Sequence, residues 1–177
     1  MKTIDNPKEA VSTWNGLLEN AEEHVFKAEV LQDYTGVDDG PSLQAWLSGN
    51  KEQAKLLAQE LMRPWIEQRM QSNTTITPVR ITEKPYIPYL EWEIECLYSV
   101  FEKTKTETIY LLPVEELDGV VLPESDLWVF DNNAALQFTF DGTQNATAGA
   151  IVIEESEIQP YLLLRDTLIA LATNANH

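Results

Sequence analysis

Cysteine, histidine and basic residues are all scarce in this sequence, and each shortage excludes a class of protein. The single cysteine, Cys96, cannot form an internal disulfide or a cysteine-rich zinc site. No run of about 18 apolar residues occurs, so we expect no transmembrane helix. The opening residues, MKTIDNPKEA, hold no apolar signal-peptide core, and we therefore expect a cytoplasmic protein.

Basic residues are outnumbered by acidic ones, 12 to 29, which gives a net charge of -17 at pH 7. Residues 1–73 carry 12 acidic and 7 basic side chains, whereas residues 74–177 carry 17 and 5. A surface of this charge repels phosphate groups and attracts a basic partner. Direct nucleic-acid binding is therefore disfavoured, although solubility alone is a simpler reason for the same charge.

Helical spacing dominates residues 1–72. Apolar residues recur at helical intervals over Leu17–Leu31, and a short helix is predicted over Pro41–Leu47 after a cap at Asp38–Asp39. Asn50 is placed to cap a further helix that starts at Lys51. A proline inside a helix removes a hydrogen bond, so Pro64 should kink or divide that helix.

From residue 73 the pattern becomes that of a sheet. Helices are predicted over 86–101 and 155–172, a turn at Asp141–Gly142, and strands over Thr74–Thr82, Thr106–Leu112, Leu127–Phe130, Ala134–Phe140 and Ala148–Ile153. Consecutive strands with short links favour an antiparallel sheet. We therefore expect a single α+β domain over 1–177. Its helical part, 1–72, should pack on a mostly antiparallel sheet of about five strands in 73–177, with a C-terminal helix.

The stretch DLWVFDNNAALQFTF, from Asp126 to Phe140, predicts a hairpin. Trp128 and Phe130 share one face of its first strand and are expected to be buried. Asp131 follows at the junction of strand and turn, where a short polar side chain accepts a backbone N–H of the turn. The pattern alone favours a structural role for Asp131 over a functional one.

The same stretch carries a family resemblance. DLWVFDNN resembles the D-[FL]-W-[LV]-F-D signature of an uncharacterised bacterial domain of unknown function, common in actinobacteria beside helix-turn-helix regulators. HVFKAEVLQDYTGVDD, PVRITEKPYIPYLEWEIE, ETIYLLPVEE and FDGTQNATAGAIVIEES resemble further blocks of that family in its order, from His24 to Leu171. The resemblance implies eight polar or aromatic site positions: His24, Phe26, Glu29, Tyr34, Tyr89, Glu93, Trp128 and Asp131.

This sequence departs from the resembling family at three positions. Many members carry arginine where this chain has Lys27, Glu91 and Tyr110. If those arginines bind an anion, most of that site is lost here, which counts against nuclease or phosphate chemistry. The resemblance implies a fold and a genomic neighbourhood but no reaction.

The eight positions divide by chemistry. The candidates for catalysis are His24, Glu29, Glu93 and Asp131, since carboxylates and imidazole serve in acid–base and metal chemistry. The candidates for binding are Phe26, Tyr34, Tyr89 and Trp128. His24 and Glu29 lie five residues apart, about 140° around a helix, so they do not share a helical face. With no glycine-rich phosphate loop, nucleophile elbow or cysteine pair in the sequence, we expect no metal site and no cofactor.

Three functions remain as hypotheses. The preferred one is a non-enzymatic, cytoplasmic protein-binding module, for example a regulatory or antitoxin-like partner of a basic protein such as a DNA-binding regulator. The second is a hydrolase or nuclease-like enzyme, intact or degenerate. The third is a small-ligand sensor with a cleft between sheet and helices. Either alternative would use a cleft lined by His24, Glu29, Glu93 and Asp131.

The charge makes a prediction about nucleic acid. We expect no binding to duplex DNA in a gel-shift assay at physiological salt, even at protein concentrations of about 100 μM, because few basic side chains are present to neutralise phosphates. A basic DNA-binding protein of similar size serves as the positive control. Micromolar binding that weakens as salt rises would contradict the prediction.

Overall fold

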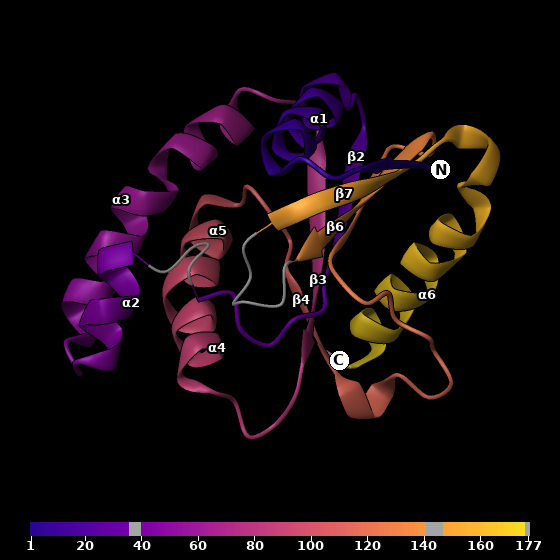
Figure 1. The fold of residues 1–177 in the computed structure, drawn as a ribbon. Coiled ribbons are helices and arrows are strands. Elements are labelled where there is room, and N and C mark those ends of the chain that lie inside the picture. The colour runs from indigo at the N-terminus through magenta and orange to yellow at the C-terminus, as the bar shows by residue number, and fades with distance from the viewer. Residues whose placement is uncertain (36–39, 141–146, 176–177) are drawn as a thin grey trace.

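A seven-stranded mixed sheet with helices on both faces forms the protein (Figure 1). The computed structural model describes residues 1–35, 40–140 and 147–175. The predicted cap at Asp38–Asp39 and the predicted turn at Asp141–Gly142 lie outside these residues. The α+β class is confirmed.

The sheet has the strand order β1-β7-β6-β5-β2-β3-β4. Neighbours are antiparallel from β1 through to β2, whereas β2–β3 and β3–β4 are parallel. The sheet is thus mostly antiparallel as predicted, but its seven strands exceed the predicted five. The strands are β1 (Lys2–Ile4), β2 (His24–Glu29), β3 (Thr75–Thr82), β4 (Tyr110–Pro113), β5 (Leu127–Phe130), β6 (Ala134–Phe140) and β7 (Thr147–Ile153).

The predicted helices over Pro41–Leu47, from Lys51 and over 86–101 correspond to helical segments of the structure. The Asn50 side chain accepts the N–H of Gln53 and caps the third helix, as predicted. That helix is not divided at Pro64. No helix among the described residues is long and apolar enough to cross a membrane. The helices are α1 (Pro7–Asn20), α2 (Gly40–Leu47), α3 (Lys51–Met70), α4 (Pro88–Trp92), the π-helical η1 (Glu93–Tyr98), α5 (Ser99–Thr104), the short 3₁₀ turns η2 (Val114–Glu116) and η3 (Glu155–Glu157), and α6 (Gln159–Ala175).

Strand β2 corrects the prediction of a helix over Leu17–Leu31. The helix ends at Asn20, and His24–Glu29 is a strand between β5 and β3. A strand buried on both faces loses the apolar–polar alternation that identifies a strand in sequence. Both Val25 and Phe26 are buried, on opposite faces. Residues 1–72 are therefore not wholly helical, since they also supply β1 and β2 to the sheet.

Each face of the sheet has its own core. Helix α6 covers one face, where Phe26 and Val79 are buried. Helix α1 packs on the other face, where the core includes Trp128 and Phe130. Trp128 is 7% exposed, which confirms that it is buried. Successive residues of a strand point to opposite faces, so the position of each β2 residue in the sequence decides which core it joins.

Strand β1 lies directly against Gly149 of β7, and this contact makes a stability prediction. A Cβ built at residue 149 would overlap the backbone carbonyl of Ile4. Gly149→Ala should therefore push β1 away and lower the free energy of unfolding by about 1–3 kcal/mol. At Gly16, in helix α1, a Cβ meets no atom within 4 Å. Gly16→Ala should raise that free energy by about 0.5–1 kcal/mol.

Urea denaturation of the two variants measures both changes. Opposite signs are expected. A Gly149→Ala variant as stable as the native protein would contradict the close packing of β1 on β7.

Candidate functional site

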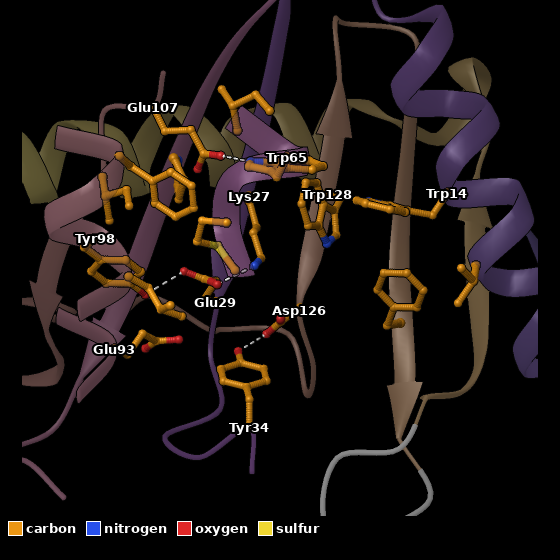
Figure 2. A pocket seen from close by; sticks show the side chains of 18 residues that line it. Trp14, Lys27, Glu29, Tyr34, Trp65, Glu93, Tyr98, Glu107, Asp126 and Trp128 are labelled. Carbon is orange, nitrogen blue, oxygen red and sulfur yellow. Dashed lines mark hydrogen bonds and ion pairs between the residues drawn. The ribbon is translucent and has the colours of Figure 1, made fainter. Parts of the chain in front are cut away.

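A pocket of about 410 Å³ lies between the α1-facing side of the sheet and the helices α1, α3, η1 and α5 (Figure 2). Strands β2, β3, β5 and β6 contribute its floor. A cavity of this volume falls in the range of small-molecule sites. Because its walls come from segments far apart in the sequence, the pocket cannot be identified from a local sequence motif.

The alternation of β2 places two charged side chains in this pocket. Lys27 and Glu29 point to the α1-facing side, whereas Phe26 and Ala28 point into the α6-facing core. Lys27 pairs across the sheet with Trp128 of β5, and its Nζ lies 5.0 Å from the centroid of the Trp128 ring. Nζ also forms an ion pair with Glu29.

Aromatic side chains make up much of the lining. The rings of Trp14 and Trp65 are stacked with centroids 6.2 Å apart, and Trp14 meets Trp128 edge-on at 5.2 Å. The indole N–H of Trp65 donates to Glu107. In contrast, the buried Nε1 of Trp14 has no hydrogen-bond partner among the described residues. The aromatic wall therefore presents one unsatisfied donor.

The π-helical turn η1 supplies a second wall with polar groups. Wider π-helical turns occur often at functional sites, and this one directs Glu93, Leu97 and Tyr98 into the pocket. The Tyr98 hydroxyl donates to Glu29 Oε2 over 3.0 Å. Figure 2 shows the carboxyl groups of Glu29, Glu93 and Asp126 arranged around a common space.

Arg80 of β3 pairs with one of these carboxylates and was not identified as a site residue from the sequence. It is completely buried, and its Nε donates to Glu93 Oε2 over 2.8 Å. Its guanidinium also donates to the backbone carbonyl of Leu31. A lone arginine among the β-branched residues of a strand was the available signal, since a buried guanidinium requires a carboxylate partner.

Burial and ion pairing shift the pKa values of the pocket carboxyl groups in different directions. Burial raises the pKa of Glu93 to about 7, although Arg80 opposes this change. Burial likewise raises the pKa of Asp126 to about 6 and raises the pKa of Glu107. At Glu29 burial also acts upward, but the charges of Lys27 and Arg80 outweigh it and lower the pKa. Perturbed acidities of this kind cluster at functional sites.

Two of these carboxyl groups each keep one oxygen without a donor. Glu93 is 3% exposed, and its Oε2 receives Arg80 while its Oε1 has no partner among the described residues. Asp126 is 5% exposed, and its Oδ1 accepts the Tyr34 hydroxyl at 2.5 Å and the Val30 N–H at 3.0 Å. No described residue donates to Asp126 Oδ2.

The four catalytic candidates do not come together. Glu29 and Glu93 line the pocket, but His24 and Asp131 do not. His24 lies five residues before Glu29 on β2, so its side chain points to the α6-facing side, where its Nε2 lies 2.9 Å from Thr77 Oγ1. Burial and then the charge of Arg165 lower the pKa of His24. The predicted cleft lined by all four residues therefore does not form.

Asp131 fastens the start of β2 to the β5–β6 turn. Its carboxylate accepts the backbone N–H groups of Glu22, Glu23 and His24 over 3.1, 3.0 and 2.9 Å. The prediction of a donor within the turn itself is thus corrected to donors from the neighbouring strand. Asp131 has a φ of 48°, a conformation that aspartate and asparagine tolerate better than most residues.

The four binding candidates also divide. Tyr34 and Trp128 line the pocket, whereas Phe26 is buried in the α6-facing core and Tyr89 in the core of the helical layer. Of the three positions at which the resemblance implies arginine, Lys27 lies in the pocket, while Glu91 on α4 and Tyr110 on β4 do not line it. The residues missed in the sequence are four that line the pocket, Trp14, Trp65, Glu107 and Asp126, and also Arg80, which pairs with Glu93.

The described residues contain no cluster of three or more histidine, cysteine, aspartate or glutamate side chains that would hold a metal ion. Cys96 is buried. Burial raises its thiol pKa to about 11, so it is not activated as a nucleophile.

Comparison with known proteins gives a family and distant structural likenesses. The model of the family described as a domain of unknown function, DUF6879, matches residues 12–177. No curated protein matches the sequence significantly. The fold is similar to that of TrmBL2, an archaeal chromatin protein whose structure is described as showing a novel mode of DNA binding, with a TM-score of 0.46 and 10% identity. The match covers 96% of this chain and 50% of TrmBL2, so this chain spans about half of that protein. Nothing about function follows from a likeness this distant.

Asp131 makes a prediction that separates its structural role from a catalytic one. Asp131→Ala removes three hydrogen bonds that the carboxylate accepts from backbone N–H groups. It should lower the free energy of unfolding by about 1–2 kcal/mol, a modest value because the carboxyl is partly exposed. Asp131→Asn retains one acceptor oxygen and should cost less. Asn133→Ala, at an exposed position of the same turn, serves as the control. Equal melting temperatures for Asp131→Ala and Asn133→Ala would contradict the role.

Acid titration adds a second readout for Asp131. Partial burial raises its pKa, but the hydrogen bonds from His24, Glu22 and Glu23 lower it below the ordinary value of 3.8. A carboxyl with a lowered folded-state pKa stabilises the protein above its unfolded-state pKa, and this stability is lost as the pH falls through the folded-state value. Asp131→Asn should therefore lose less stability than the native protein over that acidic range.

Proposed function

Because the chain belongs to the DUF6879 family, a family of domains of unknown function, we propose its function from its own geometry: it is a small-molecule-binding module. The site is the pocket between the α1-facing side of the sheet and helices α1, α3, η1 and α5. This corresponds to the small-ligand sensor among the three hypotheses, with a different set of residues. The bacterial range, the neighbouring regulators and the cytoplasmic location stay predictions.

One observation carries the proposal. The pocket combines an apolar, partly aromatic lining with the buried, unpaired Nε1 of Trp14 and with two carboxyl oxygens, Glu93 Oε1 and Asp126 Oδ2, to which no described residue donates a hydrogen bond. An apolar hollow with a few convergent polar groups is the usual form of a ligand site. Each unpaired buried group costs free energy, which a ligand with the complementary group would recover.

Binding fits the pocket better than catalysis does. No histidine, cysteine, serine or threonine is among its described lining residues, so a hydroxyl or thiol nucleophile of the Ser–His or Cys–His type is not assembled there. Glu29 and Glu93 have different acidities, but Lys27 and Arg80 already pair with them. With His24 and Asp131 outside the pocket, the hydrolase hypothesis retains only Glu29 and Glu93, and each of these carboxylates is already paired with a basic side chain.

The protein-partner hypothesis stays a prediction that rests on the net charge of -17. It concerns the outer surface, whereas the pocket lies beneath the helical layer. A module that binds a small molecule inside and a basic protein outside would satisfy both. Nothing in the pocket depends on such a partner.

Filling the pocket tests the proposal. Val11 of α1 lines the pocket, and Val11→Trp should obstruct it. Calorimetric titration with small aromatic compounds that carry positive, negative or no charge should identify ligands of the native protein. The Val11→Trp variant should bind them at least about tenfold more weakly, a loss of about 1.4 kcal/mol.

Val121→Trp is the matched control, because Val121 is 87% exposed and does not line the pocket. It should bind as the native protein does, and both variants should keep the native circular dichroism spectrum. If no compound binds, or if Val11→Trp binds as tightly as Val121→Trp, the pocket is not a small-molecule site.

A further inference from the structure

We infer that the ligand of this pocket is a small organic cation, with a protonated amine held by Asp126 and Glu93 and an apolar body packed on the tryptophan wall. The inference rests on the proposed function, since it assigns a ligand chemistry to the same pocket. It adds the charge of the ligand, its polar end and the residues that select it.

The first support is an imbalance of charge in the pocket. Its described lining contains four carboxyl groups, those of Glu29, Glu93, Glu107 and Asp126, but one basic side chain, Lys27. Arg80, which does not line the pocket but pairs with Glu93, adds a second cation. Lys27 forms an ion pair with Glu29, and Arg80 forms one with Glu93. Asp126 and Glu107 form no ion pair within 4.0 Å among the described residues, although the charge of Lys27 also acts on both of them. A bound cation would reduce this excess of negative charge.

The second support comes from hydrogen bonding and does not depend on the number of acidic and basic side chains in the pocket. Asp126 and Glu93 are more than nine-tenths buried, yet Asp126 Oδ2 and Glu93 Oε1 have no donor among the described residues. A protonated primary amine carries three N–H donors and no acceptor. It can therefore donate to carboxylate oxygens that receive no donor from the described residues, which a purely apolar ligand cannot do.

The aromatic wall suits the rest of such a ligand. The Lys27 ammonium already lies 5.0 Å from the Trp128 ring centroid, so this ring accepts a cation on its face. Trp14 and Trp65 are stacked beside it, and Leu97 and Phe101 complete an apolar surface. A ligand body of one or two rings would bury its apolar area against these side chains.

An anionic ligand fits poorly for the same reasons. Both nearby cations already hold carboxylates, so a second anion would compete for them. It would also approach the unpaired oxygens of Asp126 and Glu93, where like charges repel. The pocket therefore selects against negative charge as well as for positive charge.

A matched series of probes tests the assignment. Phenethylamine, phenethyl alcohol and hydrocinnamate have similar size and differ in charge. Calorimetric titration at about pH 8 should give at least about tenfold tighter binding for phenethylamine than for phenethyl alcohol, and weaker binding still for hydrocinnamate. Equal or tighter binding of the alcohol or the carboxylate would overturn the inference.

Variants locate the amine. Asp126→Asn keeps an oxygen for Tyr34 and Val30 but removes the charge, and it should weaken phenethylamine binding at least about tenfold while changing phenethyl alcohol binding less than about twofold. Asp118→Asn, at an exposed position, is the matched control. Glu93→Gln with Glu91→Gln, an exposed neighbour on the same helical segment, forms a second pair. A loss of equal size for both probes in either site variant would overturn the inference.

The dependence on pH gives a readout that needs no variant. Glu93 faces Arg80 from β3, Lys27 and Glu29 from β2, and Tyr98 of η1; Asp126 faces Lys27, Glu29 and Tyr34. The pKa of Glu93 is about 7 and that of Asp126 about 6, so both carboxyls ionise as the pH rises from about 5 to about 8. Phenethylamine affinity should rise over this range, because its amine stays protonated, and phenethyl alcohol affinity should not. A flat phenethylamine profile would overturn the inference.

The outcomes separate this inference from the function on which it rests. If uncharged or anionic compounds bind and Val11→Trp blocks them, the pocket is a ligand site but not one for cations. If no compound of any charge binds, the proposed function itself fails. Nα-acetyl-lysine N-methylamide, whose side-chain amine is free, mimics a lysine within a peptide and therefore distinguishes a small-molecule amine from a peptide ligand. Binding of this compound as tight as that of phenethylamine would overturn the assignment to a small molecule.

Discussion

Strand β2 is the element on which the rest of the molecule depends. It pairs antiparallel with β5 and parallel with β3, and so joins the hairpin half of the sheet to the half with helical crossovers. Because its residues alternate between faces, Phe26 and Ala28 enter one core while Lys27 and Glu29 enter the pocket on the other side. Asp131 holds the first residue of the strand through backbone hydrogen bonds. A shift of one residue in register would exchange the two sets and remove both the core and the pocket.

The charges at the far end of β2 form one connected group. Arg80 is fully buried and therefore requires a carboxylate, which Glu93 provides, and the backbone carbonyl of Leu31 accepts a further bond. Glu29 is satisfied by Lys27 and Tyr98. Breaking a buried pair by removing one partner costs more than the pair contributes, so each member constrains the others. The rigid group leaves Asp126 Oδ2 and Glu93 Oε1 at its edge, facing the hollow that the proposed ligand would fill.

The sequence predicted the strands and helices whose characteristic residue spacing is undisturbed, but not strand β2, which is buried on both faces. The Leu127–Phe130 and Ala134–Phe140 strands, the helical segment after Pro88 and the Asn50 cap were predictable from alternation, helical spacing and capping chemistry. Strand β2 was not, because burial on both faces removes alternation and leaves Val25 and Ala28 at a helical interval. The pocket was harder still. Glu29 and Glu93 were identified, but Trp14 and Trp65 look like ordinary core residues in sequence, and their convergence on Trp128 depends on tertiary packing.

The overall charge and the pocket act in the same direction on a cationic ligand. A net charge of -17 gives the protein a negative potential that extends beyond its surface and raises the local concentration of small cations. That potential is screened by salt over about 10 Å at 0.1 M, so it influences the approach more than the bound state. Inside the pocket, away from salt, Asp126 and Glu93 act at short range. The acidity that disfavours nucleic acid thus favours the proposed ligand.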